Sequence, residues 1–113
     1  MTLRTAGFEP TFHKWAGEFC RGFQLHVTDR RTFKPYYTTL CLLAAIRELY
    51  PGQFAWRQPP YEYEPIRLPI DILTGTDRIR CGIEAGRSPK RLVRGWGRQR
   101  QAFLRRRRRY LRY

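Results

Sequence analysis

The segment TTLCLLAAIRELY, residues 38–50, decides the fold of this chain. Its apolar side chains recur at three- and four-residue spacing over a wide face, which predicts a helix over residues 39–50. A threonine at its start can cap that helix. The Pro51-Gly52 pair ends it, because proline cannot extend the hydrogen-bond ladder and glycine accepts a positive φ. We expect this helix to be the most buried element.

Upstream of the helix, apolar and polar residues alternate. Phe23, Leu25 and Val27 alternate with polar neighbours, which is the period of two expected of a strand with one buried face. Residues 54–56 favour a second short strand. The expected fold class is therefore α+β, with one small domain in which a short sheet packs against the buried 39–50 helix.

The remaining segments complete a single expected domain over residues 1–113. Residues 1–11 resemble a loose lead-in, and residues 68–73 fit either a short strand or one helical turn. A helix is expected over residues 77–85. Ser88-Pro89 begins another, because proline is favoured at the first helical position. We expect residues 87–113 to form one Arg-rich amphipathic helix.

The composition is that of a small globular protein. The chain has 113 residues, of which 42% are apolar, enough for one modest core. A run of about 18 apolar residues is absent, which excludes a transmembrane helix. Residues 1–10 lack an apolar stretch of signal-peptide length. We therefore expect a cytoplasmic chain, unless a preceding region carries an export signal.

The residue pattern favours neither a metal site nor a cofactor. The three cysteines, Cys20, Cys41 and Cys81, are widely spaced and form no Cys-x-x-Cys pair. The two histidines lack metal-ligand spacing. Ser88 is the sole serine, and a helix start accounts for it. We predict reduced thiols, no cofactor and no catalytic residue.

Positive charge is concentrated at the C-terminal end. The net charge is +14, but residues 1–75 hold nine Lys/Arg against seven Asp/Glu, whereas residues 76–113 hold fourteen against two. This positive charge is densest in a run of five arginines: Arg105, Arg106, Arg107, Arg108 and Arg109. Such a run can neutralise phosphates, although a solvated helix face is the alternative.

Four segments of the chain resemble a known family. They are FHKWAGE (12–18), GFQLHVTDR (22–30), PPYEYE (59–64) and LPIDILTG (68–75). In order and spacing they resemble the C-terminal domain of the NamZ family, bacterial exo-β-N-acetylmuramidases that trim peptidoglycan sugars. The family's catalytic machinery is associated mainly with an N-terminal, Rossmann-like domain, and nothing in this sequence corresponds to it.

The resemblance implies an accessory role. The chain would complete the substrate cleft of a glycoside hydrolase, as a gene fragment, a split-gene product or a stand-alone module. The implied partners are a separately encoded catalytic domain and a muropeptide or muramic-acid sugar. On this basis we expect little activity from the chain alone.

Two segments supply the candidate substrate-binding residues. In the first, His26, Asp29 and Arg30 follow the predicted strand. The planar donor fork of arginine suits the lactyl carboxylate of a muramic acid. Alternatively, Asp29 and Arg30 fold back on the loop backbone.

The second segment is acidic and aromatic. Tyr61, Glu62, Tyr63 and Glu64 form an expected extended loop, in which Glu62 and Glu64 point the same way, and Asp71 lies nearby in sequence. Paired carboxylates can hold sugar hydroxyls. The alternatives are a solvated acidic loop or pairing with Arg57 and Arg67.

A second function class remains open at this stage. The chain could be a small basic nucleic-acid-binding protein that acts through residues 87–113. Residues 87–113 show no ordered set of base-reading side chains, so we expect such binding to be weak, non-specific and steeply salt-dependent.

Overall fold

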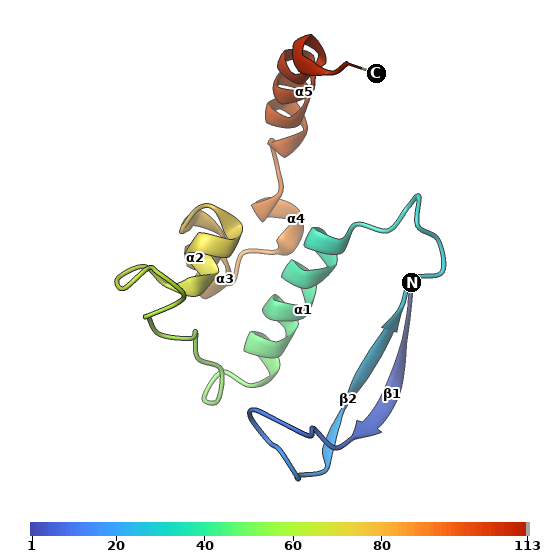
Figure 1. Ribbon diagram of the computed structural model, residues 1–113, viewed down its shortest axis with the longest axis vertical. Helices are drawn as coiled ribbons and strands as arrows, with labels where there is room; N and C mark the ends of the chain where they lie inside the picture. The colour runs from blue at the N-terminus through green and yellow to red at the C-terminus, as the bar shows by residue number, and fades with distance from the viewer. Residues whose placement is uncertain (113) are drawn as a thin grey trace. The chain divides into compact units, whose positions relative to one another are not determined.

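The computed structural model describes residues 1–112. The chain divides into two compact units, Met1–Pro35 and Tyr36–Tyr113, and each is described by itself. The first unit is a strand hairpin and the second is helical (Figure 1). The expected α+β class is confirmed.

The first unit is an antiparallel hairpin of β1, Thr2–Phe8, and β2, Cys20–His26. The register pairs Thr2 with His26 and Phe8 with Cys20. The strand predicted over residues 23–27 is confirmed, but its predicted buried face is wrong, because Phe23 and Val27 are exposed.

The strand partner of β2 is not the predicted one. The loose lead-in expected over residues 1–11 is wrong, because most of that segment is β1. β1 is mainly exposed, so it carries no apolar alternation that would reveal a strand. The strand expected over residues 54–56 is also wrong. The first helix is followed by a turn over residues 51–53, closed where the Tyr50 carbonyl accepts the Phe54 N–H at 2.9 Å, and residues 54–56 have no regular secondary structure.

Two aromatic rings cover glycines on the hairpin. A Cβ added to Gly7 would lie 2.5 Å from Cζ of Phe19, and one added to Gly22 would lie 3.5 Å from Cε1 of Phe8. An aromatic ring over a strand glycine replaces the packing that the missing side chain cannot provide. The two glycines therefore let the rings approach the hairpin backbone closely.

The second unit consists of short helices joined by turns. They are α1 (Pro35–Leu49), α2 (Pro69–Thr74), α3 (Arg78–Glu84), α4 (Pro89–Leu92), α5 (Trp96–Arg107) and the 3₁₀ turn η1 (Arg108–Tyr110). The helices predicted over residues 39–50 and 77–85 are confirmed as α1 and α3. The open choice at residues 68–73 is resolved as a helix. α1 begins at Pro35, so Thr38 and Thr39, either of which is a candidate cap from the sequence, lie inside the helix.

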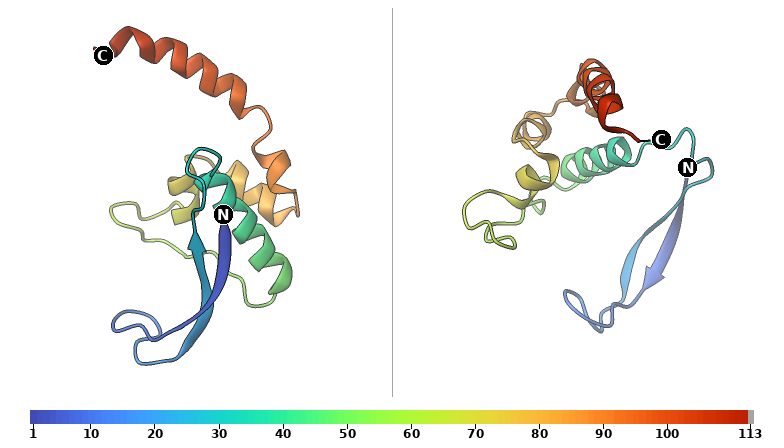
Figure 2. Two further views of the ribbon diagram at one scale, coloured as in Figure 1. Left: turned by 90° about the vertical axis from the view of Figure 1, so that its right-hand side faces the viewer. Right: turned by 45° about the horizontal axis from the view of Figure 1, so that its top comes forward.

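The single helix expected over residues 87–113 is interrupted. α4 ends at Leu92 and α5 begins at Trp96, with Gly95 between them at φ 93°. This left-handed conformation suits glycine and breaks the helical ladder. Figure 2 shows α5 as a separate rod beyond the break. Among the described residues of α5, no side chain is buried.

The core of the second unit lies between α1 and α3. Leu40, Ile79 and Ile83 are 2–3% exposed, and Leu43, Trp56, Leu92 and Val93 pack against them. α3 contributes two of these three buried side chains, so the expectation that α1 is the most buried element is wrong. Gly82 of α3 is also buried, and a Cβ there would meet the Leu92 side chain. Over residues 1–112, no helix is long and apolar enough to cross a membrane.

We predict that Leu40→Ala lowers the free energy of unfolding by about 2–5 kcal/mol, the range for truncating a buried leucine. The control is Leu42→Ala on the same helix, where the side chain is 37% exposed. We expect the control to cost less than about 1 kcal/mol. Urea denaturation followed by circular dichroism measures both. Equal losses would mean that the contact between α1 and α3 does not hold the unit together.

Candidate functional site

The first candidate segment lies at the end of β2, in the first unit. His26 Nε2 lies 3.2 Å from Oε1 of Gln24, two residues away on the same face of the strand. Asp29 Oδ1 accepts the N–H of Arg31 at 2.9 Å, and this hydrogen bond lowers the pKa of Asp29. Asp29 therefore closes its own turn, as the alternative interpretation expected. Arg30 is exposed on that turn.

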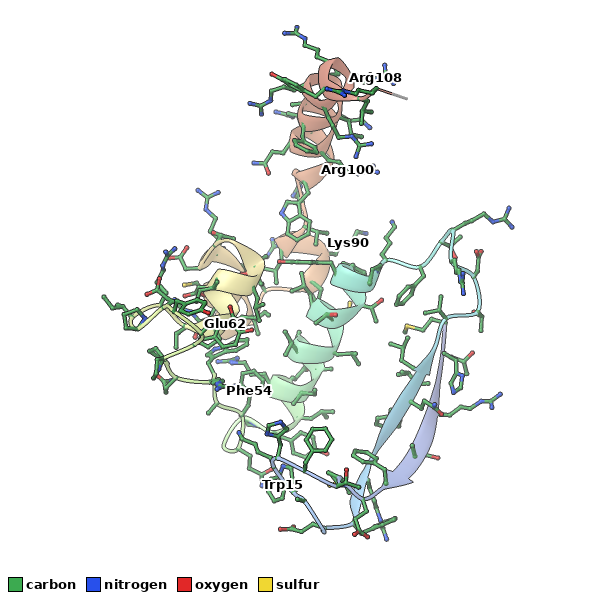
Figure 3. All side chains as sticks on the ribbon, in the orientation of Figure 1. Trp15, Phe54, Glu62, Lys90, Arg100 and Arg108 are labelled. Atoms are coloured by element: carbon green, nitrogen blue, oxygen red, sulfur yellow. The ribbon has the colours of Figure 1, made fainter. Side chains whose placement is uncertain are left out.

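The second candidate segment is a tight turn rather than an extended loop. Tyr61 and Glu64 exchange both backbone hydrogen bonds, each at 3.0 Å, and Glu62 between them has φ 52°. The prediction that Glu62 and Glu64 point the same way along an extended backbone is therefore wrong. Glu62 and Tyr63 form the tip of the turn, and Tyr63 is fully exposed. Figure 3 shows Glu62 on this turn, beside the short helices.

Glu64 holds the turn in place. Its Oε1 accepts the N–H groups of Ile66 and Arg67 at 3.0 and 3.1 Å, and its Oε2 accepts Nε–H of Arg67 at 3.0 Å. These hydrogen bonds, with the backbone donors first, lower the pKa of Glu64. The carboxylate is thus engaged within the chain, as the alternative of pairing with Arg67 expected.

Arg57 contacts an aromatic ring of the turn. Its guanidinium carbon lies 5.7 Å from the centroid of the Tyr61 ring, within the range of a cation–π interaction. The alternative interpretation paired Arg57 with a carboxylate of this loop, and the structure gives it this ring contact instead. Tyr61 is half-buried, so it supports the turn while Tyr63 projects from it.

Asp71 lies in a network that joins α2 to α3. Nε of Arg80 lies 3.0 and 3.1 Å from the two Asp71 oxygens, and Nη1 of Arg80 lies 3.3 Å from Oε2 of Glu84. Glu84 Oε1 also accepts the indole N–H of Trp56 at 2.9 Å. The Asp71 and Arg80 side chains are 14% and 20% exposed. The hydrogen bond to Asp71 raises the pKa of Arg80.

This network includes three residues that the sequence analysis missed: Trp56, Arg80 and Glu84. The spacing of Arg80 and Glu84 places them one helical turn apart, which is a recognisable signal for an ion pair. Their link to Asp71 depends on how α2 packs on α3, and sequence spacing does not contain that information.

The Arg-rich run lies at the far end of the second unit. Arg105, Arg106 and Arg107 form the last turn of α5, and Arg108 and Arg109 lie in η1. All five are exposed. Figure 3 shows Lys90, Arg100 and Arg108 succeeding one another from α4 to the end of this basic segment.

The titratable side chains do not gather into a metal site. Within residues 1–112, no group of three or more His, Cys, Asp or Glu side chains could hold a metal ion. Cys20, Cys41 and Cys81 are free thiols. The groups that the predicted binding segments leave open to a ligand are Arg30 in the first unit and Glu62 and Tyr63 in the second.

Comparisons with known proteins identify relatives of the chain. A family model described as "Exo-beta-N-acetylmuramidase NamZ, C-terminal" matches residues 1–113. The peptidoglycan beta-N-acetylmuramidase NamZ of Bacillus subtilis (strain 168) is 35% identical over 113 residues. That alignment covers 100% of this chain and 25% of the relative, so the chain spans about a quarter of the relative's length. No solved structure matches the chain.

We predict that Asp71→Asn lowers the free energy of unfolding by about 1–3 kcal/mol, because it takes from the half-buried Arg80 the nearer of its two carboxylate partners and leaves only Glu84. Glu62→Gln is the control: it makes the same kind of change on an exposed side chain. We expect that control to stay within about 0.5 kcal/mol of wild type. Urea denaturation compares the two. If both variants match wild type, the network contributes nothing to stability and Asp71 is free for another role.

Proposed function

This chain belongs to the family of NamZ C-terminal domains, and we propose that it is an accessory domain that binds a muramic-acid sugar of peptidoglycan. A catalytic region outside this chain would supply the reacting groups. The related protein from Bacillus subtilis is a peptidoglycan beta-N-acetylmuramidase, and the match covers about a quarter of it.

The three candidate carboxylates of the second unit support a binding role over a catalytic one. A glycosidase of the usual kind needs two carboxyl groups that flank the scissile bond. Here Glu64 is held by Arg67 and by two backbone N–H groups, and Asp71 is held by Arg80. Glu62 is left as a single exposed carboxylate on its turn. One such group can accept hydrogen bonds from sugar hydroxyls, but it cannot serve as both acid and base.

The turn from Tyr61 to Glu64 is the observation that carries the proposal. Its backbone is fixed by the reciprocal hydrogen bonds and by the Glu64 carboxylate, so little freedom is lost when a ligand binds. Its tip presents the flat ring of Tyr63 beside the carboxylate of Glu62. A ring of this kind packs on the apolar face of a sugar, and the carboxylate accepts from its hydroxyls.

Arg30, in the first unit, is the candidate for contacting a carboxylate group. A muramic acid carries a lactyl carboxylate, and a guanidinium binds carboxylates through two parallel N–H donors. The carboxylate of the neighbouring Asp29 accepts a hydrogen bond from the Arg31 backbone N–H. It does not pair with the Arg30 guanidinium. We assign these contacts for each unit by itself: Arg30 of the first unit to a lactyl carboxylate, and Glu62 and Tyr63 of the second unit to sugar hydroxyls and a sugar ring.

We predict that the chain binds an N-acetylmuramic-acid-containing disaccharide and that Tyr63→Ala weakens this binding about ten-fold, equivalent to about 1.4 kcal/mol. Chemical-shift titration by NMR measures the affinity. The matched control is Tyr50→Ala, which removes another exposed tyrosine, just after α1, and leaves the turn intact. A loss of the same size in both variants, or no shift in the wild-type chain, would contradict sugar binding at the turn.

We predict no turnover of a chromogenic N-acetylmuramide by this chain alone, because its candidate carboxylates are paired or solitary. The assay compares wild type with Glu62→Gln after repeated purification. Turnover that persists through repurification and disappears in Glu62→Gln would show that the chain carries its own catalytic group.

A further inference from the structure

A basic groove lies within the second unit, between α3 and the α4–α5 segment. It has a volume of about 710 Å³. Arg78, Arg87, Arg91 and Arg94 line it, and Asp77 is the one acidic residue among its lining residues. The groove therefore gathers positive charge from three parts of the chain onto one concave surface.

The four groove arginines have no carboxylate partner among the described residues. The ion pairs of the structure engage Arg31, Arg67 and Arg80 instead. No acidic residue follows Glu84, whereas residues 85–113 hold twelve arginines and lysines. A concave surface lined by one sign of charge focuses its electric field and attracts a ligand of the opposite sign.

An aromatic side chain lies in the same groove. Trp96 lines it and makes an edge contact with Tyr36, with ring centroids 5.2 Å apart and planes at 73°. This contact fixes the indole, which remains 36% exposed. Phe103 follows on α5 seven residues later, about two helical turns, and is also exposed. The α5 segment therefore carries exposed aromatic rings as well as arginines.

We propose that the groove binds single-stranded nucleic acid, with its guanidinium groups on successive phosphates and the Trp96 indole stacked on a base. Guanidinium forks match phosphate oxygens, and aromatic rings give sequence-tolerant stacking with every base. The arginines of α5 and η1 extend the positive surface beyond the groove. This inference rests on charge and aromatic placement, independently of the proposed sugar binding.

The proposal locates binding in the groove rather than in the Arg105–Arg109 run. Side chains in that run are exposed around a helix end, whereas the groove gathers its arginines on one concave surface. Binding driven by net charge alone would depend on the number of arginines removed and not on their position. Two variants of equal charge therefore separate the possibilities.

The test measures binding of a fluorescein-labelled oligothymidylate of about twelve nucleotides by anisotropy, at about 50 mM and about 200 mM salt. Arg91→Gln/Arg94→Gln alters the groove, and Arg108→Gln/Arg109→Gln removes the same charge outside it. We expect the groove variant to lose at least about ten-fold in affinity and the tail variant about three-fold or less. Equal losses, or no binding by wild type at the lower salt, would overturn the proposal.

Trp96→Leu tests the stacking contact, because it keeps apolar volume without a ring. We expect it to weaken oligothymidylate binding several-fold and to leave binding of inorganic polyphosphate, which has no bases, unchanged. Circular dichroism checks that the variant is folded, and Trp96→Phe should restore binding if the ring matters. An equal effect on both ligands, or on neither, would overturn the assignment of nucleic acid. Muramyl disaccharide binding should be the same in wild type and the groove variant, so the two proposals fail separately.

Discussion

The contact between α1 and α3 is the interaction on which the second unit depends. Leu40 meets Ile79 and Ile83 there, and Nη1 of Arg47 donates to the Ile83 carbonyl at 3.2 Å. With so few fully buried side chains, the free energy from apolar burial is small, and a small domain of this kind is marginally stable. The ionic network from Asp71 through Arg80 and Glu84 to Trp56 adds a second set of contacts around α3. The candidate turn lies in the chain between Trp56 and Asp71, and both of these residues belong to this network.

How far the sequence predicts this structure varies with the kind of signal. α1 and α3 are recognisable because their apolar residues repeat with the helical period and clear end signals follow them. β1 carries little apolar alternation because it is largely exposed, so only its pairing with β2 reveals it. The break before α5 depends on the positive φ of Gly95, and a glycine within a helical pattern does not by itself announce that conformation.

The sequence indicates which residue types the candidate site contains, but not how their side chains are arranged. Residue types made Tyr61–Glu64 a candidate for sugar contacts, but they did not indicate that Glu64 would bond back to its own loop. The same holds for Asp71, whose partner Arg80 is distant enough in sequence that only the packing of α2 on α3 brings them together. The pKa of Glu64 is lowered by hydrogen bonds that exist only in the folded turn. Such partnerships separate a carboxylate that supports the fold from one that can meet a ligand.

The absence of buried side chains in α5 also affects how this domain can evolve. Substitutions in a packed helix are restricted by its neighbours, and most of them lower stability. α5 has no such restriction, so its arginines can be gained or lost by mutation while the contact between α1 and α3 stays intact. The surface charge of the domain is therefore a trait that selection can adjust separately from its folding.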